Sequence, residues 1–69
     1  MADPNPLVDD TNRRILQLLA DGLSRDQIEL ELGLHKNTVS RRLGTLRLQF
    51  GAMTTPHLVA LALRRRWIT

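Results

Sequence analysis

The 69-residue sequence contains no cysteine, no tyrosine, one tryptophan and one phenylalanine. Without cysteine the chain can form neither a disulfide nor a thiolate metal site, which fits a cytoplasmic protein. It also lacks any run close to the roughly 20 apolar residues that a membrane-spanning helix needs, and its polar, acidic start is unlike a secretory signal. We therefore expect one small domain outside the membrane, which buries only about 60% of its unfolded surface.

The second half of the chain lacks acidic residues altogether. Residues 1–34 hold seven acidic and three basic residues, a net charge of −4, whereas residues 35–69 hold seven basic residues, a net charge of +7. This separation of charge suggests that one surface of the protein faces a polyanion. The alternative is an ordinary solvated basic face.

The sequence also lacks a catalytic or metal-binding constellation. Its two histidines, His35 and His57, stand apart, and neither has a paired nucleophile or clustered carboxylates. The glycines are isolated and form no phosphate-binding loop. We therefore expect no enzymatic activity, no cofactor, no metal and no small-molecule ligand.

Apolar spacing predicts an all-α domain of four helices. Residues 1–7 contain two prolines and are expected to form a disordered lead-in, which leaves residues 8–69 as a single helix-turn-helix domain. The first helix is expected over about residues 9–21, with Asp9 as its N-cap and Gly22 in a left-handed conformation after its end. Its buried side should hold Ile15, Leu16, Leu18 and Leu19.

The second helix is expected to open at Ser24, because Ser24 and Gln27 have the spacing of a capping box. Its apolar positions are Ile28, Leu30 and Leu32. Its acidic residues, which phosphate would repel, are Asp26, Glu29 and Glu31. Gly33 then provides the turn, since glycine adopts a positive φ at little cost, and Leu34 packs the turn against the core.

The third helix is expected over about residues 36–50, with His35 at its N-cap position. One edge has the apolar spacing of a buried helix face: Val39, Leu43, Leu46 and Phe50. The opposite face carries small and basic residues and no acid: Lys36, Asn37, Ser40, Arg41, Gly44 and Arg47. A basic, donor-rich helix held from behind by apolar contacts is what reading the major groove of double-stranded DNA requires.

This face supplies a set of candidate DNA contacts. Arg41 is expected to be the chief base reader, because an arginine can donate to guanine O6 and N7 together. The full base-reading set is Asn37, Ser40, Arg41 and Gly44. Contacts to phosphate are expected from Ser24, His35, Lys36, Thr38, Arg42 and Arg47. The mid-helix Gly44 is explained equally well by close helix packing and by clearance for the DNA.

The fourth helix is expected over about residues 56–66, with Thr55 as its N-cap and Pro56 as its first residue. Four apolar residues can face the core: Leu58, Val59, Ala62 and Leu63. A second edge is more than a short surface helix needs and suggests a partner helix, and hence a homodimer, through His57, Ala60, Leu61 and Arg64. Trp67 and Ile68 should close the chain against the core. The basic run 64–66 is expected to be solvated and to favour the negative end of the helix dipole.

Several motifs follow one another in a single register without a gap: ILQLLADGLS at 15–24, Ile28, LGL at 32–34, Thr38-Val39, Leu43, Gly51 and LVALALRRRWI at 58–68. Through them the stretch from Val8 to Ile68 resembles the DNA-binding domain of LuxR/GerE-type transcription regulators. The resemblance implies a four-helix domain whose third helix enters the major groove, a homodimer formed through helix four, and a two-fold related DNA site. Without a sensor domain, the chain resembles the stand-alone, GerE-like kind.

The sequence departs from that family at Asn12, where Glu is common, and at Arg66, where Gly is typical. The family also carries more lysine where this chain has Ser40, Arg41 and Gly44, so the target DNA sequence cannot be carried over from relatives. Two other resemblances stay open. LVDDTNRRIL at 7–16 and VSRRLGTL at 39–46 are similar to Lrp/AsnC regulators, whose domains continue into a β-wing, and region four of RNA polymerase sigma factors has a similar helix-turn-helix.

The sequence thus predicts a sequence-specific transcription regulator, associated with the nucleoid, that binds double-stranded DNA as a homodimer through helix four. The alternative is an adaptor that docks through helix four on another regulator or on RNA polymerase instead of on DNA.

Overall fold

The computed structural model describes residues 9–69, so the expected lead-in at residues 1–7 lies outside the described residues. The described residues form four helices and no strand: α1 Asp10–Ala20, α2 Arg25–Leu32, α3 Thr38–Phe50 and α4 Thr55–Arg64. The expected all-α, four-helix fold is therefore confirmed, and residues 9–69 contain no β-wing. None of these helices is long and apolar enough to cross a membrane.

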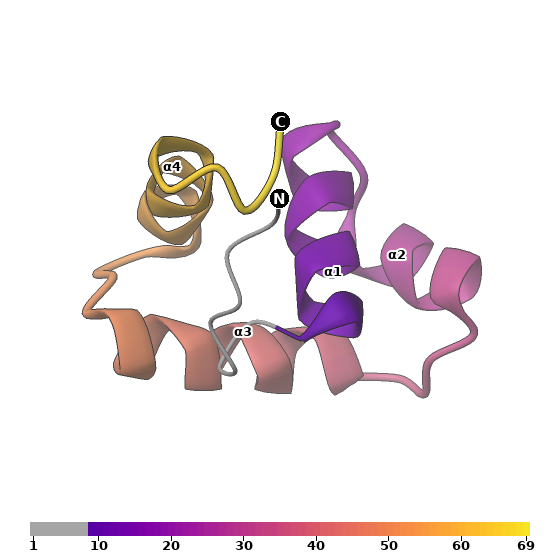
Figure 1. Ribbon diagram of the computed structural model, residues 1–69. Helices are drawn as coiled ribbons and strands as arrows, with labels where there is room; N and C mark the ends of the chain where they lie inside the picture. The colour runs from indigo at the N-terminus through magenta and orange to yellow at the C-terminus, as the bar shows by residue number, and fades with distance from the viewer. Residues whose placement is uncertain (1–8) are drawn as a thin grey trace.

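Helix α3 lies along one edge of the molecule, across the end of α1, with α2 and α4 at its two ends (Figure 1). Both α1 and α3 pack against α2 and α4, so the four helices surround one core. The core residues come from all four helices and from the C-terminal segment: Ile15, Leu16, Ile28, Val39, Leu43, Leu46, Leu58, Ala62, Trp67 and Ile68. The buried edge of α3 faces this core and leaves its other side outermost.

Three helix ends follow the local chemistry that the sequence predicts. Asp9 caps α1 and accepts a hydrogen bond from the Asn12 backbone N–H at 2.8 Å. Ser24 and Gln27 form both hydrogen bonds of a capping box at the start of α2. Gly33 ends α2 with a φ of 66° in the left-handed region.

Two predicted helix starts are wrong by one or two residues. Helix α3 begins at Thr38, and its N-cap is Asn37 in the left-handed conformation, not His35. Asparagine tolerates that conformation better than most residues, which allows the turn after Gly33 to extend further. Helix α4 begins at Thr55 and is capped by Thr54, whose hydroxyl accepts from the His57 N–H. Pro56 is therefore one residue inside the helix.

Two leucines are exposed: Leu30, one of the apolar positions of the second helix, and Leu63, which was expected to face the core. Leu30 is 85% exposed, because the buried edge of α2 runs through Ile28 and successive residues on a helix turn by about 100°. Leu63 is 44% exposed for the same reason, since it follows the buried Ala62. The only large apolar residues that α2 and α4 offer to solvent in the described chain are these two.

The C-terminal segment returns from α4 to lie beside α1 (Figure 1). Trp67 and Ile68 are buried, as expected, and the Gln17 side chain makes hydrogen bonds in both directions with the backbone of Thr69. The Arg65 guanidinium lies 5.4 Å from the Trp67 ring centroid and 5.7 Å from that of Phe50. Arg65 thus covers an aromatic pair by cation–π contact, which corrects the expectation that the whole run 64–66 is merely solvated.

Helix α4 ends at Arg64, and Arg66 then adopts a left-handed conformation with a φ of 60°. A residue with a Cβ is strained there, whereas glycine is not. We expect Arg66→Gly to raise the free energy of unfolding by about 0.5–1 kcal/mol, measured by urea denaturation. Arg64→Gly, inside the last turn of α4, should lower it; equal effects of the two changes would contradict the strain at Arg66.

Candidate nucleic-acid interface

The outer side of α3 is the candidate interface. Ser40 and Arg41 are exposed, as are Lys36 and Asn37 in the turn that leads into the helix. Gly44 and Arg47 are half-buried, and α3 contains no acidic residue. Four of the six residues expected on this face are thus fully accessible, and we call Lys36, Asn37, Ser40, Arg41, Gly44 and Arg47 the outer face of α3.

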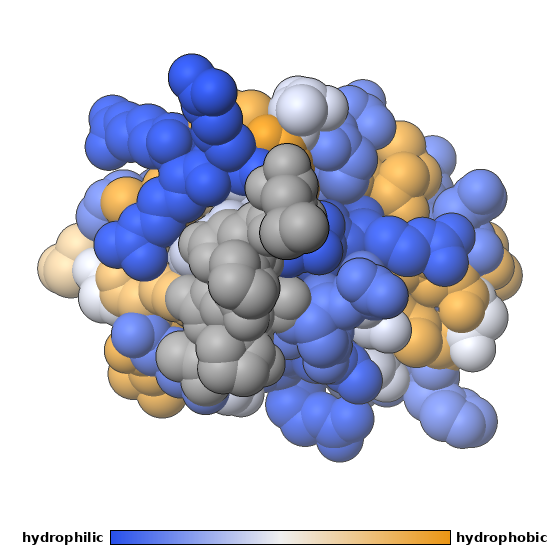
Figure 2. Space-filling view, viewed as in Figure 1, coloured by the Kyte–Doolittle hydropathy of each residue, from blue (hydrophilic) through white to orange (hydrophobic). Residues whose placement is uncertain are grey.

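Surface character changes along this edge of the molecule. Figure 2 shows hydrophilic surface at the bottom of the view and hydrophobic surface at lower left, on the side where α3 ends. Leu48, in the last turn of α3, is 86% exposed. The edge therefore offers charged donors and an apolar group side by side.

The start of α3 is fixed by a side chain from α2. The N-cap Asn37 makes no side-chain hydrogen bond to the helix, so α3 has no cap of its own. Instead the Val39 N–H donates to Glu29 Oε2 at 3.2 Å, and Glu29 is only 8% exposed. A carboxylate at this position satisfies one free N–H and lies at the positive end of the helix dipole. Glu29 therefore couples the two helices, a role that the sequence, which shows it only as one of three acids on α2, did not predict.

Arg25 is a cation of this site that sequence reasoning missed. Its guanidinium donates to the Ser40 hydroxyl at 3.0 Å and to the Thr55 hydroxyl at 3.3 Å, so it joins α2, α3 and α4. Its partners lie 15 and 30 residues away in sequence, and no local pattern signals such contacts. Because Arg25 is exposed beside Ser40, it adds a positive charge next to the outer face of α3.

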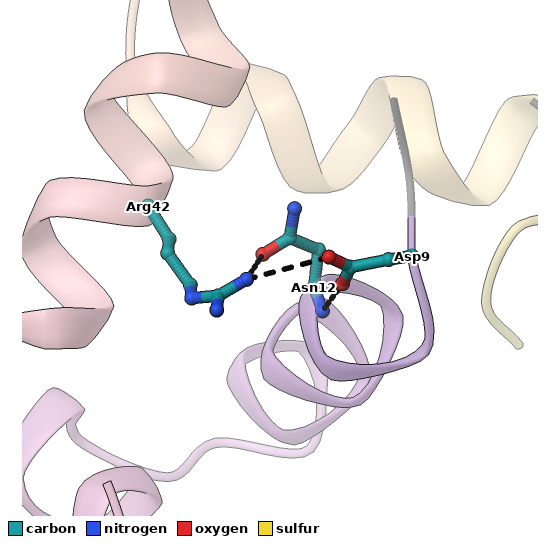
Figure 3. A network of polar contacts seen from close by, with 3 residues as sticks. All are labelled: Asp9, Asn12 and Arg42. Carbon is teal, nitrogen blue, oxygen red and sulfur yellow. Dashed lines mark hydrogen bonds and ion pairs between the residues drawn. The ribbon is translucent and has the colours of Figure 1, made fainter. Parts of the chain in front are cut away.

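Arg42 is held by the start of α1 (Figure 3). Its guanidinium donates to Asn12 Oδ1 at 3.0 Å and lies 3.5 Å from Asp9 Oδ2. Arg42 was expected to contact phosphate, and in that role a phosphate would compete with the Asp9 carboxylate for its guanidinium. The contact with Arg42 gives the Asn12 side chain a partner on α3.

An open hollow lies between this network and the outer face of α3. It is lined by Asn12, Arg41, Arg42 and Thr45. Two of its four lining residues are arginines, and one of them, Arg42, is held by Asn12 and Asp9. The hollow therefore continues the candidate interface from Arg41 towards α1.

The remaining candidate contacts divide into accessible and buried ones. Ser24 and His35 are exposed near the starts of α2 and α3, where phosphate contacts were expected. Thr38 is buried, and its backbone N–H donates to the His35 carbonyl oxygen at 3.2 Å. The expectation that Thr38 contacts phosphate is therefore wrong, because the first turn of α3 rotates its side chain towards the core.

On α4 the expected partner edge is partly accessible. His57, Ala60 and Leu61 are half-buried and Arg64 is exposed. His57 Nδ1 accepts a hydrogen bond from the Met53 N–H at 3.1 Å, which gives this histidine a structural partner in the loop before α4. Among the residues from Asp9 onward, no three His, Cys, Asp or Glu side chains come together in a way that could hold a metal ion.

Comparisons of this chain with models of protein families, with curated proteins and with solved structures find no match.

The cap supplied by Glu29 can be tested through stability. Glu29→Ala leaves the Val39 N–H without its acceptor in a buried position, which should lower the free energy of unfolding by about 1–3 kcal/mol. Glu31→Ala, an exposed acid on the same helix, should change it by less than about 0.5 kcal/mol. Urea unfolding followed by circular dichroism measures both, and matching effects of the two variants would remove the cap from the account of α3.

Proposed function

We propose that this protein is a sequence-specific DNA-binding transcription regulator that inserts α3 into the major groove. The exposed, acid-free outer face of α3 carries this proposal. Ser40 and Arg41 point outward from a helix whose other side is fixed in the core, and a rigid donor-bearing helix is the element that major-groove reading requires. The resemblance to LuxR/GerE-type regulators supports the same conclusion. A protein with this function would be associated with the nucleoid.

In this proposal α2 and α3 divide the contacts. Arg41 reads guanine, Asn37 and Ser40 contact neighbouring bases, and Arg25 holds the Ser40 hydroxyl in place. Lys36, His35 and the N-terminus of α2 at Ser24 contact phosphate, where they fix the orientation of the protein on the duplex. Arg47 contributes charge from the half-buried flank of α3.

Gly44 supports contact with an external partner. Glycine within a helix costs roughly 1 kcal/mol relative to alanine. A Cβ added at Gly44 would meet nothing within 4 Å, and this residue has no positive φ, so nothing in the described fold requires glycine there. Of the two explanations offered by the sequence, clearance for a partner on the outer face of α3 is favoured over close helix packing.

The proposed regulator is a homodimer that pairs through α4. The half-buried edge of Ala60 and Leu61 and the exposed Leu63 supply apolar surface for a second copy. Two copies related by two-fold symmetry would present their α3 helices to successive major grooves, about one helical turn of DNA apart. DNA selected for binding should therefore contain inverted repeats with that spacing, and selection of single, unpaired sites would argue for a monomer.

The role of Arg41 is tested with a duplex selected from a random pool by the protein itself. Arg41→Ala should weaken binding to that duplex by about 5- to 100-fold, because a bidentate contact to guanine is lost. Arg14→Ala is the matched control, since it removes one exposed positive charge from α1. Affinity should also fall steeply with salt for the parent protein. If Arg41→Ala binds the duplex as tightly as Arg14→Ala does, α3 does not read the DNA.

The same duplex tests the role of Gly44. Gly44→Ala should raise the free energy of unfolding by about 1 kcal/mol and at the same time weaken DNA binding, because the new methyl group occupies space meant for the duplex. Gln49→Ala, exposed on the same helix, should leave binding unchanged. A Gly44→Ala protein that is more stable and binds DNA normally would contradict the clearance argument.

A protein-binding adaptor is the second candidate, favoured by the exposed Leu63 on α4. It would dock on another regulator or on RNA polymerase and would need no DNA contact of its own. The two candidates differ in one measurement, the retardation of random duplexes at low salt. No retardation would favour the adaptor, since even non-specific DNA binding is strong when salt does not compete for the phosphates.

A further inference from the structure

The side of α3 that carries Arg41 changes chemistry beyond that residue. The residues that follow Arg41 at spacings of three, four and seven are Gly44, Thr45 and Leu48, so all of them lie on the same side of the helix as Arg41. None of them carries a charge. Sequence reasoning singled out Gly44 alone among these three, because the exposure of Leu48 is visible only in the structure.

Leu48 has no partner within the described fold. It is 86% exposed, whereas Leu43 and Leu46 on the same helix are buried in the core. A single exposed leucine is ordinary on a protein surface. This one lies on the face that already carries Arg41, two turns further along the helix, and hydrophobic surface is visible on the side where α3 ends (Figure 2).

Thr45 presents a methyl group on this face. Its hydroxyl donates to the Arg41 carbonyl oxygen at 3.2 Å, one turn back along α3. With the hydroxyl occupied by the backbone, the γ-methyl group is the part of this exposed side chain that remains for an outside partner. Gly44 lies beside it and adds no bulk, so Thr45 and Leu48 border an open space on the helix surface.

We propose that Thr45 and Leu48 read thymine by apolar contact with its C5-methyl group, next to the guanine read by Arg41. Thymine is the base that offers a methyl group in the major groove, and apolar side chains are its partners there. Leu48 lies about 10.5 Å beyond Arg41 along the helix axis, a length that spans at most roughly three base-pair steps. The inference rests on the proposed function and specifies which bases this helix selects.

The test removes one methyl group at a time from the DNA. In the duplex selected by the parent protein, each dT is replaced singly by deoxyuridine, which differs from dT only by the missing methyl group. At one or two positions within about three base pairs of the guanine read by Arg41, binding should weaken by about three- to fivefold, the effect of one buried methyl group.

Protein variants then assign the contact. At the position read by Leu48, Leu48→Ala should bind the dT duplex and the deoxyuridine duplex equally, because the group that senses that methyl is gone. Thr45→Ser removes only a methyl group and keeps the hydroxyl, and should abolish the penalty at its own position. Leu30→Ala is the matched control, an equally exposed leucine on α2, and should keep the full preference for dT.

Four outcomes would overturn the inference while leaving the proposed function intact. The selected sites could hold guanine but no thymine near it, no deoxyuridine duplex could bind more weakly, or Leu48→Ala could keep the dT preference. If Leu48→Ala instead lowers the sedimentation mass and leaves dT discrimination unchanged, Leu48 is a protein contact and the inference is likewise wrong. Failure of the parent protein to select any DNA would refute the proposed function itself.

Discussion

The hydrogen bond from the Val39 N–H to the Glu29 carboxylate fixes the helix on which the candidate site is built. Helix α3 follows a turn that ends in a left-handed Asn37 and supplies no cap of its own. A carboxylate from α2 takes that place, and the Leu34 N–H donates to the Glu29 carbonyl oxygen at 2.9 Å. One residue therefore holds the turn with its backbone and α3 with its side chain, which sets the angle between the two helices.

The separation of charge along the chain also contributes to the packing of the helices, because acidic residues of the first half contact α3. Two acids of the first half approach α3 from the inner side, Glu29 at its first turn and Asp9 beside Arg42. Both are held by the buried or half-buried part of the helix, and the exposed residues Ser40 and Arg41 meet no acid on α3 itself. The acidic half thus anchors the basic half and leaves its outward donors uncompensated.

The sequence allowed the prediction of those features whose causes lie within four residues. The caps at Asp9 and Ser24, the left-handed Gly33 and the buried edge of α3 follow from short-range spacing, and the structure confirms them. The turn before α3 was placed wrongly because the cap expected from its own residues comes from Glu29, ten residues earlier. Arg25 was missed for the same reason, since its partners come from two other helices.

The burial of individual residues was also difficult to predict from the sequence, because apolar residues occur on protein surfaces as well as in cores. Leu30 is one of the apolar positions of α2 and Leu63 was expected to face the core, yet each lies away from the buried edge of its helix. The prediction for Thr38 failed in the opposite direction, since a polar residue in the first turn of α3 is covered by the fold. Short helices have too few turns for spacing alone to fix which edge faces inward.

On one side of α3, two residues are not explained by helix propensity or by packing in the fold. A glycine stands in the middle of a helix with open space around it, and a leucine two turns from Arg41 is left in solvent. Each feature costs stability or gains none, in a 69-residue domain that has little to spare. A single exposed leucine is ordinary on a protein surface, but this leucine and this glycine lie on the same face as the exposed donors. Their coincidence is expected when a second molecule, rather than the fold, completes the packing of that face.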